Sequence, residues 1–171
     1  MTSGFFQRIS AFTMGNRFWT IVTLALITLV SCDSSTIFVE SEDIENATWS
    51  ETDTLYAKFE VKDTTRYHSV FLNSRFSSEY KFSNIYFKVI LDGPGNQRIE
   101  RVRGFEVTDK AGKWLGSGFG SLYGYAFPIF EDLSLKQNGK YKVRIVPYMR
   151  IPDLNGIHDR GVKVSLGQEI F

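Results

Sequence analysis

The chain has 171 residues, with 20 basic and 19 acidic side chains and 43% hydrophobic residues. This length allows one domain with a sizeable core, and the balanced charge lacks the basic excess expected of a nucleic-acid-binding protein. The single cysteine excludes an internal disulfide and a cysteine-based zinc site.

The first 31 residues predict an export signal. Arg8 and Arg17 are the only charges before Asp33, and the thirteen residues from 18 to 30 carry none. This apolar run is shorter than the about 20 residues of a membrane-spanning helix and is typical of a secretory signal peptide. It ends in LVSC, residues 29–32, which matches a bacterial lipobox. An ordinary signal peptide that happens to end near a cysteine is the alternative.

Cleavage before Cys32 leaves 140 residues with 18 basic and 19 acidic side chains. We expect diacylglyceryl and acyl chains, such as palmitate, on Cys32 to hold the protein on a bilayer, and we expect no other cofactor. The polar, acidic stretch that follows predicts a tether. The expected boundaries are 1–31 for the signal peptide, 32–54 for the lipidated cysteine with its tether and entry loop, and 55–171 for the folded domain.

From Leu55 onwards, short segments alternate between apolar and polar residues. Residues 55–61 (LYAKFEV), 84–91 (NIYFKVIL), 141–147 (YKVRIVP) and 161–166 (GVKVSL) follow this pattern, and turn sequences separate them at 92–96 (DGPGN) and 137–140 (QNGK). Strict alternation predicts half-buried strands. Seven or eight such strands predict an all-β fold, an antiparallel β-sandwich of the jelly-roll or immunoglobulin-like type.

The segment GKWLGSGFG, residues 112–120, is rich in glycine and contains a lysine. A Walker loop needs the lysine after its second glycine and a hydroxyl after the lysine, whereas here the lysine follows the first glycine and Trp114 comes next. Gly116, Gly118 and Gly120 also lack the spacing of a dinucleotide fingerprint. Glycine permits tight turns and close backbone approach, so the segment predicts a packing and turn element.

No catalytic or metal-binding motif is present, so the sequence predicts no enzyme. His68 and His158 are isolated, and a zinc site needs three or four ligands at recognisable spacing. An envelope enzyme remains an alternative, because either histidine could meet a carboxylate in a cleft.

Three blocks of the chain, in order, resemble the gliding motility lipoproteins of the GldH family. They are the region from Trp49 and Asp53 through FEVKDTTRYHSVFLNSRFSSEYKFSNIYF, the segment DKAGKWLGSGFG, and NGKYKVRIVPYMRIPDLNGIHDRGVKV. The matching positions include Phe59, Asp63, Tyr67, Arg75, Tyr80, Asn84, Phe87, Met149, Arg150, Leu154, Gly156, Ile157, Asp159 and Gly161. The signal segment is longer than is usual before the apolar run, which leaves Met14 as an alternative start.

The resemblance implies a non-enzymatic component of the gliding apparatus that supports the stability of partner lipoproteins of the motility and type IX secretion machinery. It favours the outer membrane, on the periplasmic face rather than the cell surface. Under the enterobacterial sorting rule, Asp33 after the lipidated cysteine would instead favour the inner membrane.

Candidate partner contacts are Trp114, Tyr125, Met149 and Arg150, because interface centres favour aromatic residues, methionine and arginine. Trp114 and Met149 could instead fill the core. A glycan- or peptide-binding module of the envelope is the second class of function. For sugars it requires two or three coplanar rings open to solvent, with Trp114 or Tyr125 among them.

Overall fold

The computed structural model describes residues 35–169, which are almost entirely β-structure. Within this range the strands are β1 (Thr36–Asp43), β2 (Thr48–Ser50), β3 (Leu55–Val61), β4 (Arg66–Ser77), β5 (Asn84–Asp92), β6 (Arg98–Glu106), β7 (Ser117–Phe119), β8 (Leu122–Leu133), β9 (Gly139–Pro147), β10 (Asp153–Asn155) and β11 (Ile157–Glu169). Two three-residue 3-10 helices, η1 (Glu45–Ala47) and η2 (Pro94–Asn96), interrupt them. No helix in this range is long and apolar enough to cross a membrane.

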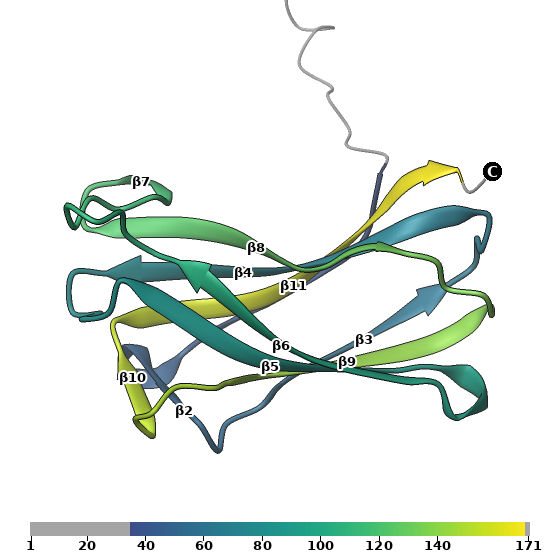
Figure 1. Cartoon of the computed structure of the whole chain (residues 1–171), viewed down its shortest axis with the longest axis horizontal. Coiled ribbons are helices and arrows are strands. Elements are labelled where there is room, and N and C mark those ends of the chain that lie inside the picture. Colours follow the sequence, from purple (N-terminus) through teal and green to yellow (C-terminus); the bar gives the residue numbers. More distant parts are fainter. Residues whose placement is uncertain (1–34, 170–171) are drawn as a thin grey trace, which may run out of the picture. The chain divides into compact units, whose positions relative to one another are not determined.

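Two antiparallel sheets face each other and confirm the predicted β-sandwich (Figure 1). Sheet A has the order β1-β11-β4-β8-β7, and sheet C has the order β3-β9-β5-β6. A separate ribbon of β10 and β2 lies at one end. Because β1 and β3 are both edge strands on the same side, the Phe38 and Phe59 rings meet across the gap at 6.2 Å.

The core lies between the sheets and follows the alternation read from the sequence. In β3, Leu55, Ala57, Phe59 and Val61 are buried while the residues between them are exposed. The inward residues of β5 and β9 are likewise buried, and Val162 and Val164 of β11 close the core from sheet A. Burial of apolar area at about 25 cal/mol per Å² is the main favourable term for such a domain.

Sheet edges are protected by arginines that point inward from β6. The Arg101 guanidinium lies 5.5 Å from the centre of the Phe130 ring, and Arg103 donates to the Pro128 carbonyl at 3.4 Å. Pro128 lies in β8 opposite Phe71 of β4, and Glu131 lies 3.7 Å from Arg103. Inward charges and proline on edge strands discourage pairing with another chain.

The structure differs from the prediction of a tether and entry loop over residues 32–54. Residues 36–43 form β1, which pairs with β11 from Thr36 opposite Ser165 to Asp43 opposite Asp159. Residues 48–50 form β2, which pairs with β10. The tether prediction is wrong for these two segments. Their polar residues suggested a tether, but β1 is an edge strand and β2 belongs to a short ribbon, and both kinds of strand expose many polar side chains.

All long strands run between two ends of the sandwich (Figure 1). The end where β1 begins at Thr36, near the last residues of β11, is called the Thr36 end. The opposite end, called the distal end, carries the β2–β10 ribbon and the connections at 78–83, 107–116 and 148–152. The 13 residues of β11 span about 40 Å at about 3.3 Å per residue.

Candidate interaction surface

Exposed apolar side chains gather at the distal end. Leu115, Ile151 and Phe82 are 54%, 37% and 37% exposed, and each belongs to a different connection. Tyr86 and Tyr148 lie beside them on the outer face of sheet C. Exposed apolar residues at the same end of a domain are candidates for a contact site. We call the connections 78–83, 107–116 and 148–152 the distal loop surface.

Backbone hydrogen bonds fix the connections 78–83 and 107–116 against each other, while 148–152 is bonded to β5 and to residue 51 through Tyr148 N and the Pro152 carbonyl. The Ser83 carbonyl accepts from Val107 N at 2.7 Å and Thr108 N at 3.1 Å, and Leu115 N donates to the Val107 carbonyl at 3.0 Å. Within the loop, Asp109 Oδ1 accepts from two backbone amides at 2.9 Å each. The exposed side chains are therefore presented on a defined backbone.

The glycines of residues 112–120 serve this packing, in two different ways. A Cβ on Gly118 would stand 2.0 Å from the Leu122 carbonyl oxygen, and one on Gly116 would stand 2.5 Å from the Tyr125 ring. Only Gly120 of the three has a positive φ, of 76°, and it has open space around it. Close approach therefore explains Gly116 and Gly118, and backbone conformation explains Gly120.

The four predicted contact residues all lie at the distal end but differ in burial. Tyr125 is half-buried and donates its hydroxyl to the Val107 carbonyl, and burial raises the pKa of this phenol. Met149 and Trp114 are half-buried against the core, and Trp114 stacks on Tyr123 at 4.6 Å with an interplanar angle of 6°. Arg150 is exposed and makes no ion pair within residues 35–169.

Leu115, the most exposed apolar residue of the connection 107–116, was not among the predicted contact residues. Leu115 directly follows Trp114. Trp114 was predicted instead because tryptophan is enriched, and leucine is under-represented, at the centres of interfaces. In the structure the leucine faces solvent while the indole covers Tyr123. Cys32, the predicted lipid-attachment residue, lies outside the described residues.

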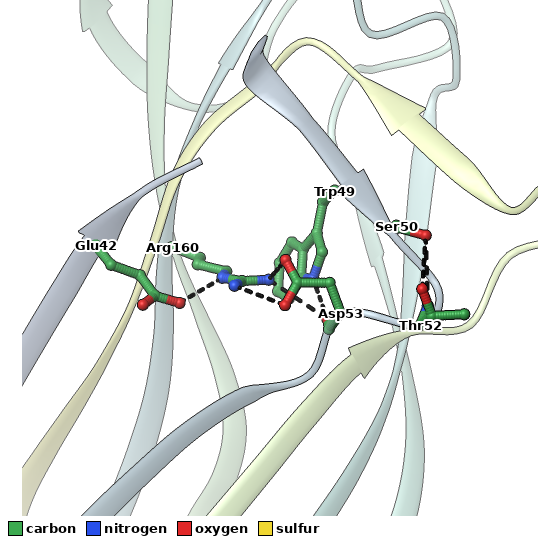
Figure 2. A network of polar contacts seen from close by, with 6 residues as sticks. All are labelled: Glu42, Trp49, Ser50, Thr52, Asp53 and Arg160. Atoms are coloured by element: carbon green, nitrogen blue, oxygen red, sulfur yellow. Dashed lines mark hydrogen bonds and ion pairs between the residues drawn. The ribbon is translucent and has the colours of Figure 1, made fainter. Parts of the chain in front are cut away.

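A buried arginine attaches the β2–β10 ribbon to the sandwich (Figure 2). Arg160 of β11 binds Asp53 through two nitrogens at 2.9 and 3.0 Å, and its Nε donates to Glu42 at 2.7 Å. The guanidinium also lies 4.9 Å from the Trp49 ring centre. Trp49 Nε1 donates to the Asp53 carbonyl at 2.7 Å, so both ends of the aspartate are held.

This network has the character of a structural clamp. The Arg160 side chain is only 9% exposed, whereas those of Asp53 and Glu42 are 49% and 52% exposed. Two-pronged pairing of a guanidinium with a carboxylate is strong and directional. Because Trp49 is fully buried and packs 5.7 Å from Phe87, the clamp joins β1, β2, β11 and the β2–β3 connection to the core.

The two histidines do not meet a carboxylate within the described part of the chain. His68 is fully buried, neither ring nitrogen has a hydrogen-bond partner, and burial lowers the pKa of this imidazole. His158 is half-buried, and its Nε2 is also unpartnered. Residues 35–169 contain no group of three or more metal-ligating side chains.

The fold is that of an antiparallel β-sandwich domain with exposed apolar side chains at one end of its strands. The family model described as GldH lipoprotein matches residues 36–164. The chain therefore belongs to the GldH lipoprotein family, and it is a lipid-anchored protein of the cell envelope.

Two curated relatives agree with this assignment. A gliding motility lipoprotein GldH homolog of Christiangramia forsetii is 28% identical over 152 residues, which cover 85% of this chain and 93% of the relative. The gliding motility lipoprotein GldH of Flavobacterium johnsoniae is 28% identical over 153 residues, covering 85% and 94%. A role as a gliding motility lipoprotein follows from these relatives.

Solved structures give a much weaker likeness. The VP2 subviral particle of infectious bursal disease virus aligns with a TM-score of 0.37 and 14% identity. The alignment covers 79% of this chain, which spans only 34% of the viral chain. A TM-score this low supports no argument about function.

Proposed function

We propose that this lipoprotein holds another lipoprotein of the gliding and type IX secretion machinery through its distal loop surface, and that it is not an enzyme. The observation that carries the proposal is that Leu115, Ile151 and Phe82, three exposed apolar residues, lie on three connections at the same end of the sandwich, two of which are hydrogen-bonded to each other. Arg150 adds a charged side chain free to pair with a partner.

The clamp around Arg160 supports the same function. A contact surface binds best when its backbone is already ordered, because less conformational freedom is then lost on association. Arg160, Asp53 and Trp49 fix the ribbon of β2 and β10, from which residues 148–152 lead back to β9.

The second part of the proposal is that lipid is attached to Cys32. The third is that the domain lies on the periplasmic face of the outer membrane. Cys32→Ala removes the only thiol. Labelled fatty acid should enter the wild-type protein and not the variant, and fractionation should find the wild type in the outer membrane. Equal labelling of both proteins would contradict the attachment.

The docking role is tested by changing exposed residues that the fold does not need. Leu115→Ser and Arg150→Ala should leave the melting temperature nearly unchanged, while gliding and the level of a partner lipoprotein fall. Truncation of a central contact commonly costs about 2 kcal/mol or more of binding free energy. Val102→Thr is the matched control, because Val102 is 51% exposed but lies mid-strand on β6. Normal gliding and partner levels in both distal variants would contradict the proposal.

A glycan-binding role is the second candidate. It would use Tyr86, whose ring lies over Gly104: a Cβ on this glycine would stand 2.4 Å from the ring. The Tyr86 ring therefore packs against the backbone of β6 at Gly104, and Tyr86 is 43% exposed. Trp114 and Tyr125, the rings expected from the sequence, are instead engaged with Tyr123, Phe76 and Phe127. Retention of the protein on envelope polysaccharide, lost in Tyr86→Ser, would favour this role.

A further inference from the structure

The outer face of sheet C carries more basic than acidic side chains. The strand registers show which residues share this face, because paired residues point to the same side of a sheet. Its basic residues are Lys58, Lys88, Arg98, Lys140, Lys142 and Arg144, and its acidic residues are Glu60, Asp92, Glu100 and Glu106. The outer face of sheet A has no such excess, since Lys163 and Arg75 are balanced there by Asp43 and Asp159.

Three of these lysines lie together toward the Thr36 end, with Glu60 opposite Lys140 and Asp92 opposite Lys142 in the register. Asp92 forms an ion pair with Arg144 at 2.7 Å, and Glu100 forms one with Lys88 at 2.8 Å. Lys58, Lys140 and Lys142 make no ion pair within residues 35–169. We call these three residues the β3–β9 lysine patch.

The register makes this patch unusual for a sheet. Lys58 of β3 lies directly opposite Lys142 of β9, on the same face. Like charges directly opposite each other destabilise an antiparallel pair, and the Asp92 carboxylate on the other side of Lys142 is already paired with Arg144. The ammonium group of Lys142 leans instead over the Tyr56 ring, 4.6 Å from its centre. A ligand with negative charge would remove the repulsion.

Tyrosines accompany the lysines on this face. Tyr56, Tyr86 and Tyr148 are 53%, 43% and 59% exposed, and the registers place all three on the outer face of sheet C. Tyrosine and lysine are the side chains that favour the boundary between lipid and water, where an apolar body and a polar tip are both satisfied.

The length of chain between Cys32 and β1 limits where the bilayer can be. The four-residue step from Cys32 to Thr36 spans at most about 14 Å. Facing sheets lie about 10 Å apart, and β1 and β3 are edge strands on the same side. The lysine patch lies at the Thr36 end, the same end at which the chain enters the domain four residues after Cys32.

We propose that the outer face of sheet C, with its β3–β9 lysine patch, rests on the anionic headgroups of the bilayer that holds the lipid anchor. The inference depends on the proposed lipid attachment at Cys32. Each lysine that approaches an anionic surface contributes about a fivefold increase in binding. Three lysines are enough here because the anchor already supplies a high local concentration of lipid. The distal loop surface then projects along the membrane, free to meet a neighbouring lipoprotein.

Lysine footprinting of the full lipidated protein in vesicles tests the proposal. The protein is inserted into vesicles of phosphatidylcholine alone, or with phosphatidylglycerol added, and reacted briefly with an amine-acetylating reagent. Acetylation of Lys58, Lys140 and Lys142 should fall several-fold on the anionic vesicles. High salt should restore the acetylation, because the Debye screening length falls from about 10 Å at 0.1 M to about 3 Å at 1 M. Lys110 and Lys113, at the distal end, should react equally on both.

Lys58→Glu sharpens the test. It replaces a like-charge cross-strand pair with an opposite-charge pair, so the variant should fold and melt no lower than the wild type. Lys140 and Lys142 of this variant should nevertheless lose most of their protection on anionic vesicles. Lys113→Glu, an equal charge change at the distal end, should leave the protection unchanged.

Equal acetylation of the patch on both kinds of vesicle would overturn the proposal. Protection in native envelope membranes but not on anionic vesicles would also overturn it, and would assign the patch to an acidic protein. Failure of the lipid attachment has a different signature, since the protein would then not float with vesicles of either composition.

Discussion

Arg160→Ala should destabilise the domain more than any other single change to a charged residue of the clamp. The arginine is 9% exposed and is the one group that contacts Asp53, Glu42 and the Trp49 ring together. Its removal leaves a cavity beside Trp49 and releases both carboxylates. These carboxylates are about half-exposed, so they regain water and do not become buried unpaired charges.

The magnitude follows from these contacts. Hydrogen bonds to charged groups contribute about 1.5–3 kcal/mol, and the half-exposed partners place this pair in the lower part of that range. The contact with Trp49 adds about 1 kcal/mol. We expect a loss of about 2–4 kcal/mol in the free energy of unfolding, measured by urea denaturation with tryptophan fluorescence, to which Trp49 and Trp114 both contribute, as the signal.

Three further variants separate the contributions. Arg160→Lys keeps the charge but loses the two-pronged geometry, so it should recover only part of the stability. Asp53→Asn should weaken the ion pair but keep the bond from Trp49 Nε1, which is made to the backbone carbonyl of residue 53. Glu42→Gln should cost less than about 1 kcal/mol, because the Glu42 side chain is 52% exposed and its carboxylate is solvated. A loss below about 1 kcal/mol for Arg160→Ala would refute the clamp.

The remaining predictions concern the core and the glycine loop. Because burial lowers the pKa of His68 below its ordinary value of about 6.5, the unfolded chain takes up this proton first, so stability should fall as the pH drops below about 6.5. His68→Leu removes two unpartnered nitrogens, so it should stabilise the domain by about 1 kcal/mol and flatten this pH dependence; an unchanged slope of unfolding free energy against pH would contradict it. Gly120→Ala should cost about 1–2 kcal/mol through its positive φ of 76°, and Gly112→Ala, at a φ of 81° with equally open space, should match it. Gly118→Ala should cost more than either, because its Cβ would meet the Leu122 carbonyl, and equal melting temperatures for the three variants would show that close approach is unimportant.

Alternation was enough to predict the strands with one fully buried face. In β3, β5 and β9 each inward residue is apolar, and nearly all outward neighbours are polar or aromatic, with Ile90 and Val146 as exceptions, so the period of two is plain in the sequence. β1 was missed because it is an edge strand: only Thr36 and Phe38 of its first four residues are half-buried, and Glu40, Glu42 and Asp43 give it the composition of a tether.

The clamp and the lysine patch depend on contacts that sequence reading cannot supply. Arg160 and Asp53 are 107 positions apart, and only the pairing of β1 with β11 brings Glu42 to them. Lys58 and Lys142 belong to segments whose register became known only in the folded sheet. At the distal end, composition pointed to segments that carry exposed side chains, but the backbone decides that Leu115 is exposed while Trp114 is half-buried.

The most direct test of the docking role is site-specific photo-crosslinking in gliding cells. A photoreactive amino acid replaces Leu115 or Ile151 on the distal loop surface, and Val102 or Tyr56 elsewhere on exposed strands. We predict one discrete adduct, containing a second envelope lipoprotein, at Leu115 and Ile151 and no such adduct at Val102 or Tyr56. The absence of an adduct at both distal positions, in cells that glide normally, would contradict the account.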